Sequence, residues 1–594
     1  MSPKMLKKLS SILDRQQKIK ILGLTVLILI GGILETLGIS LIVPLLSAIL
    51  DEQSFAANSI VIWVMDLLGI QNIRSFIYLL LFGLIFMYVF KCAYLIGLTY
   101  VQARFVNRNR SRSTTNLLSQ FLHRPYEYYL YAETSTIVRT IYGDMDNISN
   151  LLLQVMGLIS EIVICLFMGA FLLFVDFKMM CMVVGLLLLV TVFSSKVIKP
   201  RLNKVGDGAR DEQAGMYKWI LQSASGIKDV KVANKEDYFT GRYRECVEGY
   251  GYYQIRHNVY TNMPRLLIES IAIIAILLYL ALSMIMGVDL TSMVPAISAF
   301  ALAAMRLLPS VNRVNTYIAN IAYYESALNY IYENVDTDAM SRQEELDAFR
   351  LANPNTTPIT LEKEIRLNDI TFAYPNTDKK IFNQADMQIP VGKSVGVVGP
   401  SGSGKTTIVD VLLGLLEPQN GTITSDGTNI MENYEAWLRH VGYIPQTIYM
   451  LDDSIRNNIA FGVKEEDIDD ARIWEVLNQA QMKEFVEQLP DKLDSQIGER
   501  GVRISGGQRQ RLGIARALYH DPELLIFDEA TSALDNDTET AIMEAIDTLH
   551  GQKTMVIIAH RLRTIENCDI IYEVKDGKIS MQRGTADSDE DNKE

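Results

Sequence analysis

The sequence predicts two domains of different class: an N-terminal membrane domain built only of helices, with six spans, and a C-terminal cytoplasmic α/β domain of the P-loop type. Two observations predict this division. Long apolar runs lie in the first 330 residues, and a GxxxxGK[ST] motif lies between a strand pattern and a helix pattern further on. At 594 residues the chain is also too long for one core. We expect a membrane domain at 1–330, a linker at 331–359, the α/β domain at 360–580 and an acidic tail at 581–594.

Each apolar run is long enough to cross a bilayer as a helix. The first run is too long for a signal peptide and no small-residue cleavage site follows it, so we expect it to be retained. A further apolar segment, Ile60–Gly69, is too short to span and is predicted to be an external or an interfacial helix. The runs cover about residues 20–49, 75–100, 150–175, 178–198, 260–287 and 291–318.

The charges beside these runs orient the membrane domain. Lysine and arginine gather before the first run and after the second and fourth, whereas acids dominate after the first and fifth. Because positively charged segments stay on the cytoplasmic side, we expect both termini in the cytoplasm. Residues 1–330 carry 30 Lys and Arg against 22 Asp and Glu, and the remaining 264 carry 26 against 47. The acidic C-terminal half argues against nucleic-acid binding, since it offers no basic stripe.

The GxxxxGK[ST] motif, Gly399-Pro-Ser-Gly-Ser-Gly-Lys-Thr406, predicts a phosphate-binding loop. The valine-rich run before it is typical of a strand, and the residues after it are typical of a helix. Glycines let backbone amides close around phosphates, Lys405 can reach the β- and γ-oxygens, and the Thr406 hydroxyl can ligate Mg²⁺. The residues expected at ATP are Gly399, Ser401, Gly402, Ser403, Gly404, Lys405, Thr406 and Thr407.

A second motif, whose serine Ser505 lies 99 residues after Thr406, narrows the class of protein. Ile504-Ser-Gly-Gly-Gln508 resembles the signature of the ABC ATPases, and further motifs follow that family's order. Leu524–Glu529 resembles the Walker B strand, which implies that Asp528 holds Mg²⁺ and that Glu529 polarises the attacking water. The resemblance also implies roles for the adenine-stacking Tyr374, for Gln446 at Mg²⁺ and the γ-phosphate, for Asp535 in the D-loop and for the switch histidine His560.

In this family the signature of one subunit closes over the phosphate loop of another. The resemblance therefore implies a homodimer with two equivalent ATP sites. In each site Ser505, the amides of Gly506 and Gly507, and Gln508 would contact the nucleotide. It also implies that short coupling helices in the cytoplasmic stretches press on the ATPase, with Glu133–Ile137 and Ser225–Val230 as the candidates.

Four cations interrupt the apolar runs of the membrane domain: Lys91, Arg265, Arg306 and Arg313. A cation that faces lipid at the bilayer centre costs roughly 2.5–3.5 kcal/mol, so these side chains should face water or a partner. Two interpretations remain open. Arg306 and Arg313 are seven residues apart on one helix face without an acid, which invites an external phosphate. Alternatively the charges are structural, because Arg265 can pair with Glu269, Arg313 can snorkel, and Glu35 and Glu161 can neutralise others.

The stretches Glu35–Pro44, Pro264-Arg265 and Ala303–Arg313 resemble those of PglK-type flippases, which translocate lipid-linked oligosaccharides in bacteria. In that family arginines that line the cavity engage the pyrophosphate, and Lys91 stands where the family has arginine. The resemblance implies an ATP-driven flippase in the bacterial plasma membrane that moves a polyprenyl-(pyro)phosphate-linked saccharide. The alternatives are an exporter of a peptide, drug or ordinary lipid, and a membrane ATPase that regulates a partner.

Overall fold

The computed structural model describes residues 3–40, 59–70, 72–175, 192–285, 290–335, 358–377, 379–498, 501–529, 536–559 and 565–584. Three predicted site features lie outside this description: Asp535, His560 and the side chain of Arg306. The chain forms two compact units, which are described separately. The first comprises Met1–Arg124 and Tyr131–Ala352, and the second comprises Pro125–Leu130 and Asn353–Glu594.

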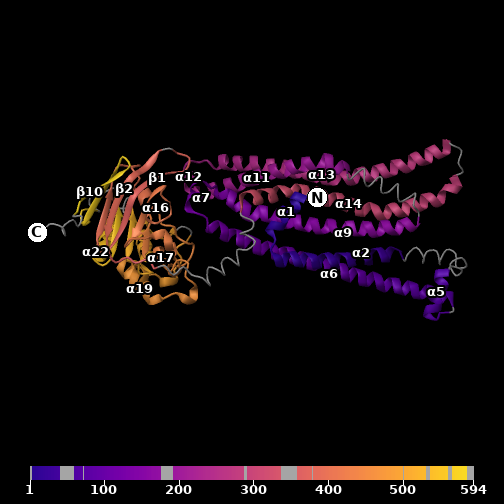
Figure 1. The fold of residues 1–594 in the computed structure, drawn as a ribbon, viewed down its shortest axis with the longest axis horizontal. Helices are drawn as coiled ribbons and strands as arrows, with labels where there is room; N and C mark the ends of the chain where they lie inside the picture. Colours follow the sequence, from indigo (N-terminus) through magenta and orange to yellow (C-terminus); the bar gives the residue numbers. More distant parts are fainter. Residues whose placement is uncertain are drawn as a thin grey trace. The chain divides into compact units, whose positions relative to one another are not determined.

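The first unit is helical throughout its described residues, and its long helices run alongside one another (Figure 1). α9 packs against α14, α2 and α6, and α11 packs against α13 and α14. Two π-helical turns, η1 (Thr140–Asp144) and η2 (Ser194–Ile198), precede α9 and α11. The helices are α1 (Pro3–Ile12), α2 (Arg15–Ser40), α5 (Ser59–Leu68), α6 (Ile73–Leu122), α8 (Thr134–Arg139), α9 (Met145–Val175), α11 (Lys199–Ser225), α12 (Ile227–Val232), α13 (Glu236–Ile285) and α14 (Leu290–Asn334).

Among the described residues, three stretches are long and apolar enough to cross a membrane: Arg15–Leu37, Ile73–Leu122 and Thr134–Phe167. The helix α14 also continues without a break through the sixth predicted run, and α13 covers the fifth as far as Ile285, the last described residue before a gap. Most of the predicted span 178–198 lies outside the described residues. On α6, Phe86 is 74% exposed in the single chain, as expected of a side chain that faces lipid.

The short helix α5 occupies the apolar segment between the first two predicted spans. It packs back on the start of α6, where Val61 and Phe76 are buried together with Met65 and Ile77 against them. Trp63 is 64% exposed, so its ring is available to a membrane interface or to a ligand. Both predicted interpretations of this helix remain proposals.

The second unit contains two sheets with helices around them (Figure 1). The larger sheet has the strand order β10-β9-β3-β8-β7-β6, and the smaller, antiparallel sheet has the order β2-β1-β4-β5. The strands are β1 (Glu364–Ala373), β2 (Lys380–Pro390), β3 (Ser394–Val398), β4 (Asn420–Ser425), β5 (Thr428–Asn429), β6 (Val441–Ile444), β7 (Leu524–Asp528), β8 (Thr554–Ile558), β9 (Ile570–Lys575) and β10 (Lys578–Arg583). The helices are α7 (Tyr126–Tyr131), α16 (Lys405–Leu412), α17 (Tyr434–Arg439), α18 (Ile455–Ile459), α19 (Asp470–Gln479), α20 (Lys483–Glu487), α21 (Gly506–Leu518) and α22 (Asn536–Leu549), with short 3₁₀ turns at Ile430–Asn433, Glu465–Asp467 and Lys492–Asp494.

The central strands explain why chemistry gathers at one edge of the larger sheet. β3, β8, β7 and β6 are mutually parallel, and β7 and β8 are buried along their whole length. Parallel strands that are covered on both faces present their carboxyl ends together, and ligands bind outside those ends. The loop after β3, the acids after β7 and the loop after β6 therefore meet at one edge.

The stretch that follows α6 is divided between the two units. Pro125–Leu130, which holds most of α7, belongs to the second unit. The predicted coupling segment Glu133–Ile137 belongs to the first unit. The sequence pattern could not separate these neighbours, because both are short helical stretches.

Candidate functional site

The phosphate loop connects β3 to α16. Gly402 and Gly404 have φ values of 75° and 105°, a backbone conformation that glycine adopts without strain. A Cβ on Gly404 would lie 2.7 Å from Ile381 Cγ2, so the site requires glycine for space as well. The Lys405 side chain is buried, and its Nζ donates to the carbonyl oxygens of Gly399 and Pro400 at 3.0 and 3.1 Å. The sequence thus folds into a concave loop with a cation held at its centre.

The two threonines that follow Lys405 differ in their exposure to solvent. Thr406 is exposed, whereas Thr407 is buried on α16. The Tyr374 hydroxyl lies 3.0 Å from Thr407 Oγ1, and the Tyr374 ring packs edge-on against Phe372. An aromatic ring is therefore fixed beside the loop in position to stack on a base.

Two acids stand at the end of β7. Asp528 is 4% exposed and Glu529 follows it with a φ of 49°, a left-handed conformation that is uncommon for glutamate. The Glu529 amide donates to the carbonyl oxygen of Ile558, and Gln446 Nε2 donates to Glu529 Oε2 at 2.7 Å. A left-handed residue held by these contacts turns the carboxylate to the sheet edge, where such strain is commonly functional.

Burial raises the pKa of two carboxyl groups at this edge of the sheet. It raises the pKa of Asp528 to about 6, with Glu529 as the next cause, although the Tyr443 hydroxyl and Lys405 act in the opposite direction. Burial and the neighbouring Asp528 likewise raise the pKa of Asp410 on α16 to about 6. Close carboxylates in a poorly solvated place favour a bound cation, because a cation would neutralise them both.

Two buried oxygen atoms at the site have no hydrogen-bond partner among the described residues: Asp528 Oδ1 and Ser403 Oγ. Buried polar atoms are normally paired, so each of these positions fits an additional ligand. A hard divalent cation takes oxygen ligands, and phosphate oxygens accept hydrogen bonds from hydroxyls. The donor set therefore suits Mg²⁺ with a nucleotide polyphosphate.

The second predicted motif forms the start of α21. Ser505 Oγ accepts a hydrogen bond from the Gln508 amide at 3.2 Å, and the Gln508 side chain accepts one from the Ser505 amide at 2.8 Å. This capping box leaves Ser505 and Gly506 exposed, whereas Gly507 is buried. The observed partner of Ser505 is thus in its own helix, and the exposed helix start presents amides to a second molecule.

Comparisons with known proteins agree with both parts of the molecule. Residues 21–307 match the family described as the ABC transporter transmembrane region, and residues 382–532 match the family described as ABC transporter. This chain belongs to the ABC transporters. Its ATPase domain binds ATP, and this multi-pass membrane protein couples ATP hydrolysis to transport.

Relatives of this ABC transporter include two ATP-dependent lipid A-core flippases. That of Ralstonia nicotianae is 28% identical over 497 residues, which are 82% of this chain and 81% of the relative. That of Pectobacterium atrosepticum is 27% identical over 567 residues, or 93% and 91%. A solved bacterial Atm1-family ABC exporter with ATP bound has a TM-score of 0.69 at 20% identity and covers 96% of this chain and 95% of its own. These comparisons confirm the predicted fold class.

The predicted cations of the membrane domain are paired with acids wherever the transporter's side chains are described. Lys91 Nζ lies 3.8 Å from Glu35 Oε1, and Arg265 Nε lies 3.0 Å from Glu269 Oε1 within the same helix. The pair of Lys91 and Glu35 joins α6 to α2, and the third pair joins α14 to α9. All three pairs use acids that the structural interpretation of these charges named, namely Glu35, Glu161 and Glu269.

Arg313 on α14 contacts Glu161 on α9 through both carboxylate oxygens. The Glu161 side chain is 8% exposed, whereas that of Arg313 is 46% exposed. Ser310 accepts a further hydrogen bond from Arg313 Nη2 at 3.3 Å. The predicted span that contains Arg313 has no acid of its own, and its partner is Glu161 on α9, one of the acids that the structural interpretation named as able to neutralise these cations.

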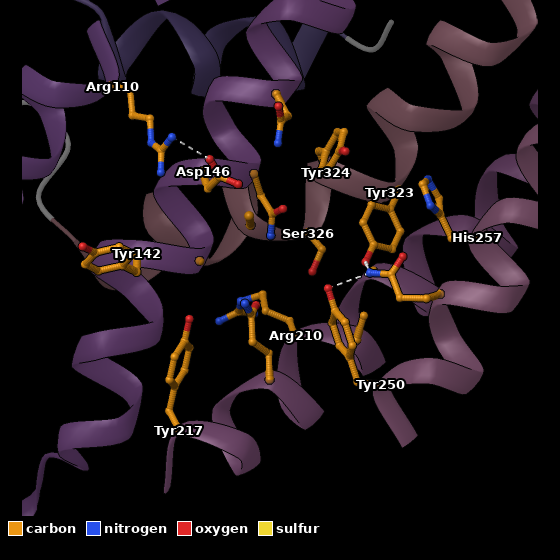
Figure 2. A pocket seen from close by; sticks show the side chains of 18 residues that line it. Arg110, Tyr142, Asp146, Arg210, Tyr217, Tyr250, His257, Tyr323, Tyr324 and Ser326 are labelled. Carbon is orange, nitrogen blue, oxygen red and sulfur yellow. Dashed lines mark hydrogen bonds and ion pairs between the residues drawn. The ribbon is translucent and has the colours of Figure 1, made fainter. Parts of the chain in front are cut away.

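A polar cavity of about 330 Å³ lies among η1, α9, α11, α13 and α14 (Figure 2). Tyrosine rings surround it, and Gln254 donates to the hydroxyls of Tyr250 and Tyr323. Arg210 also lines it and contacts Asp144, which is completely buried, at 2.8 Å. Arg110 and Asp146 also line it and pair at 3.0 Å, so several of its polar side chains bond to one another. Sequence reasoning missed this cluster, although tyrosine richness in this stretch was a signal.

Proposed function

We propose that this chain acts as a homodimer that uses ATP to flip a phosphate-bearing, polyprenyl-linked oligosaccharide or a similar glycolipid across the bacterial plasma membrane. The observation that carries the proposal is the family of its relatives, which are named lipid A-core flippases and align along most of this chain. Lipid A-core and polyprenyl-linked saccharides share a lipid tail, phosphate and sugars. Both termini face the cytoplasm in this proposal.

Within each ATP site, Tyr374 stacks on adenine and the loop amides with Lys405 hold the phosphates. Thr406, Gln446 and Asp528 hold Mg²⁺, which when bound neutralises charge on the β- and γ-phosphate oxygens. The unpaired Oδ1 of Asp528 supports this assignment. Gln446 fits the same role, because its amide nitrogen is bonded to Glu529 and its carbonyl oxygen can face the metal.

Hydrolysis in this proposal depends on positioning. Glu529 orients the attacking water and accepts its proton, while Gln446 holds the carboxylate in place through the hydrogen bond described above. His560 contacts the γ-phosphate and Asp535 connects the two sites, both as the resemblance implies. Ser505, Gly506, Gly507 and Gln508 of the partner subunit's α21 close the site.

The exposed start of α21 supports dimer formation. One chain supplies one phosphate loop and one signature, and in this chain the exposed Ser505 makes its hydrogen bonds with Gln508. A second copy would bring another α21 against the first loop. Closure around two ATP molecules would turn the cargo outward, and hydrolysis would reset the transporter.

A second candidate cargo is a lipid, peptide or drug that these membrane cations do not recognise. The ion pairs of Lys91, Arg265 and Arg313 with neighbouring acids favour this alternative. Under the leading proposal the cargo phosphate must instead displace or share these pairs. The exposed Arg265, at 61%, is the described side chain that can do so most readily, and Arg306 is the other candidate.

Reconstitution distinguishes the two cargo classes. Proteoliposomes would receive either a fluorescent polyprenyl-pyrophosphate oligosaccharide or a fluorescent phosphatidylcholine, and the label in the outer leaflet would be reduced with dithionite after addition of ATP. We expect ATP-dependent movement of the first lipid and no movement with Glu529→Gln as the matched control. Movement of phosphatidylcholine alone would reject the glycolipid proposal and leave the ATPase assignment intact.

A further inference from the structure

A groove between α2 and α6 combines an apolar floor with a cationic end. It has a volume of about 440 Å³ and belongs entirely to the first unit. Leu24, Leu27 and Phe105 contribute apolar surface, and Lys20, Arg104 and Arg108 also line it. The cations lie at the cytoplasmic limits of the first two predicted spans, which end near residues 20 and 100. The groove thus has the polarity of one leaflet: apolar toward the membrane and basic toward the cytoplasm.

Three of the four cations that line this groove are not balanced by acids among the described residues. Arg112 also lines it and is paired with Asp14. Among the described residues, no carboxylate forms an ion pair with Lys20, Arg104 or Arg108. This contrasts with Lys91, whose charge is compensated by Glu35.

The spacing of the cations suits one phosphate. Arg104 and Arg108 are four residues apart on α6, so they lie on the same helix face, and Lys20 belongs to the helix that packs against that face. Guanidinium groups bind phosphate oxygens through paired N–H donors. Asn109, also in the groove, is buried, and its Oδ1 has no hydrogen-bond partner among the described residues. That oxygen can accept from a hydroxyl of a headgroup.

We propose that this groove is a binding site for an anionic phospholipid of the cytoplasmic leaflet. The phosphate lies between Arg104, Arg108 and Lys20, a headgroup hydroxyl donates to Asn109 Oδ1, and an acyl chain follows Leu24 and Leu27. Charge complementarity selects this occupant, because a zwitterionic lipid would place a second cation beside three existing ones. The site does not depend on the identity of the transported cargo, so either proposal can fail alone.

Native mass spectrometry of the full-length protein in detergent tests the site by titration with phosphatidylglycerol. We expect one tightly bound lipid, with affinity about thirtyfold lower in the Arg104→Gln/Arg108→Gln variant, since each cation near a lipid surface contributes about fivefold. Arg201→Gln is the matched control, because Arg201 is an exposed arginine beside another predicted span but outside the groove. We expect it to bind the lipid as the wild type does.

Three results would overturn the site: equal retention of phosphatidylglycerol by the double variant, an equal loss with Arg201→Gln, or full competition by glycerophosphoglycerol, which has the headgroup without chains. If the double variant does not fold, a second variant tests where the lipid binds. Phe105→Trp should be quenched by brominated phosphatidylglycerol more strongly than by brominated phosphatidylcholine. Equal quenching by the two lipids would also reject the proposal.

Discussion

Replacing Arg313 with glutamine removes the cation that faces the Glu161 carboxylate. Glu161 is 8% exposed, so the variant leaves a carboxylate with little access to water. Breaking a buried pair from one side costs about 3–5 kcal/mol. Since the Arg313 side chain is 46% exposed, its own hydration offsets part of the pair's energy, and we expect a loss near the lower end, about 3 kcal/mol.

The double variant Glu161→Gln/Arg313→Gln separates stability from cargo recognition. It leaves two neutral amides that can bond each other, so we expect it to recover most of the loss to within about 1 kcal/mol of the wild type. Arg265→Gln is the matched control. Its partner Glu269 is on the same helix and both side chains are exposed, so this change should cost only about 0.3–0.5 kcal/mol.

The assay is thermal inactivation of the detergent-purified protein, followed by the fraction that remains monodisperse on size exclusion. If Arg313→Gln is no less stable than the double variant, the two side chains are not coupled and the reasoning fails. Flipping is then measured at a temperature where all four proteins are intact. A stable double variant that flips normally would show that Arg313 serves the fold, and one that no longer flips would assign it to the cargo.

Three further predictions concern other sites. Glu529→Gln should lower ATP turnover at least about 100-fold while ATP stays bound through gel filtration, and normal turnover would remove Glu529 from the catalytic role. The pKa values of Asp410 and Asp528 are raised to about 6, and Mg²⁺ binds the ionised carboxylates. The affinity for Mg-ATP should therefore be full at pH 7.5 and fall as the pH drops through 6. Calorimetry that shows the same affinity down to pH 5 would contradict this prediction. The same shifts mean that these carboxyls take up protons on folding, so without metal their contribution to stability grows as the pH falls from 6 to 4. Asp144→Ala should destabilise the membrane unit by about 3 kcal/mol by leaving the Arg210 charge unpaired, and thermal inactivation equal to that of the wild type would refute it.

The parts of the ATP site that could be predicted are local in sequence. The phosphate loop spans eight residues, and its glycines adopt the conformations that the motif requires. The capping box joins Ser505 to Gln508, which is only three positions further along the chain. By contrast, the approach of Tyr443 to Asp528 depends on the parallel pairing of β6 and β7, which no local pattern specifies.

Helix lengths in the membrane unit show a limit of hydropathy taken alone. The second apolar run ends near residue 100, but α6 continues to Leu122 through a segment rich in arginine. Hydropathy indicates which residues can lie in the bilayer, but it does not indicate where a helix ends. Charged residues such as Arg104 and Arg108 are good helix formers and continue the helix beyond the apolar run. The same limit applies to α13, which begins at Glu236, well before the run that predicted a span.

The distribution of paired charges bears on where the transporter first meets an anionic lipid. Arginines and lysines within the spans cost energy unless they are compensated, and among the described residues Glu35, Glu269 and Glu161 compensate Lys91, Arg265 and Arg313. In our proposal the cations of the groove between α2 and α6 need no acid, because they lie at the predicted cytoplasmic ends of the spans, where water or lipid phosphate can neutralise them. A phosphate that enters from the cytoplasmic leaflet therefore gains more from the groove, which has no pair to break, than from Arg313, which must first release a buried carboxylate. On this argument the uncompensated boundary charges recruit anionic lipid, whereas the pairs of Lys91 with Glu35 and of Arg313 with Glu161 hold neighbouring helices together.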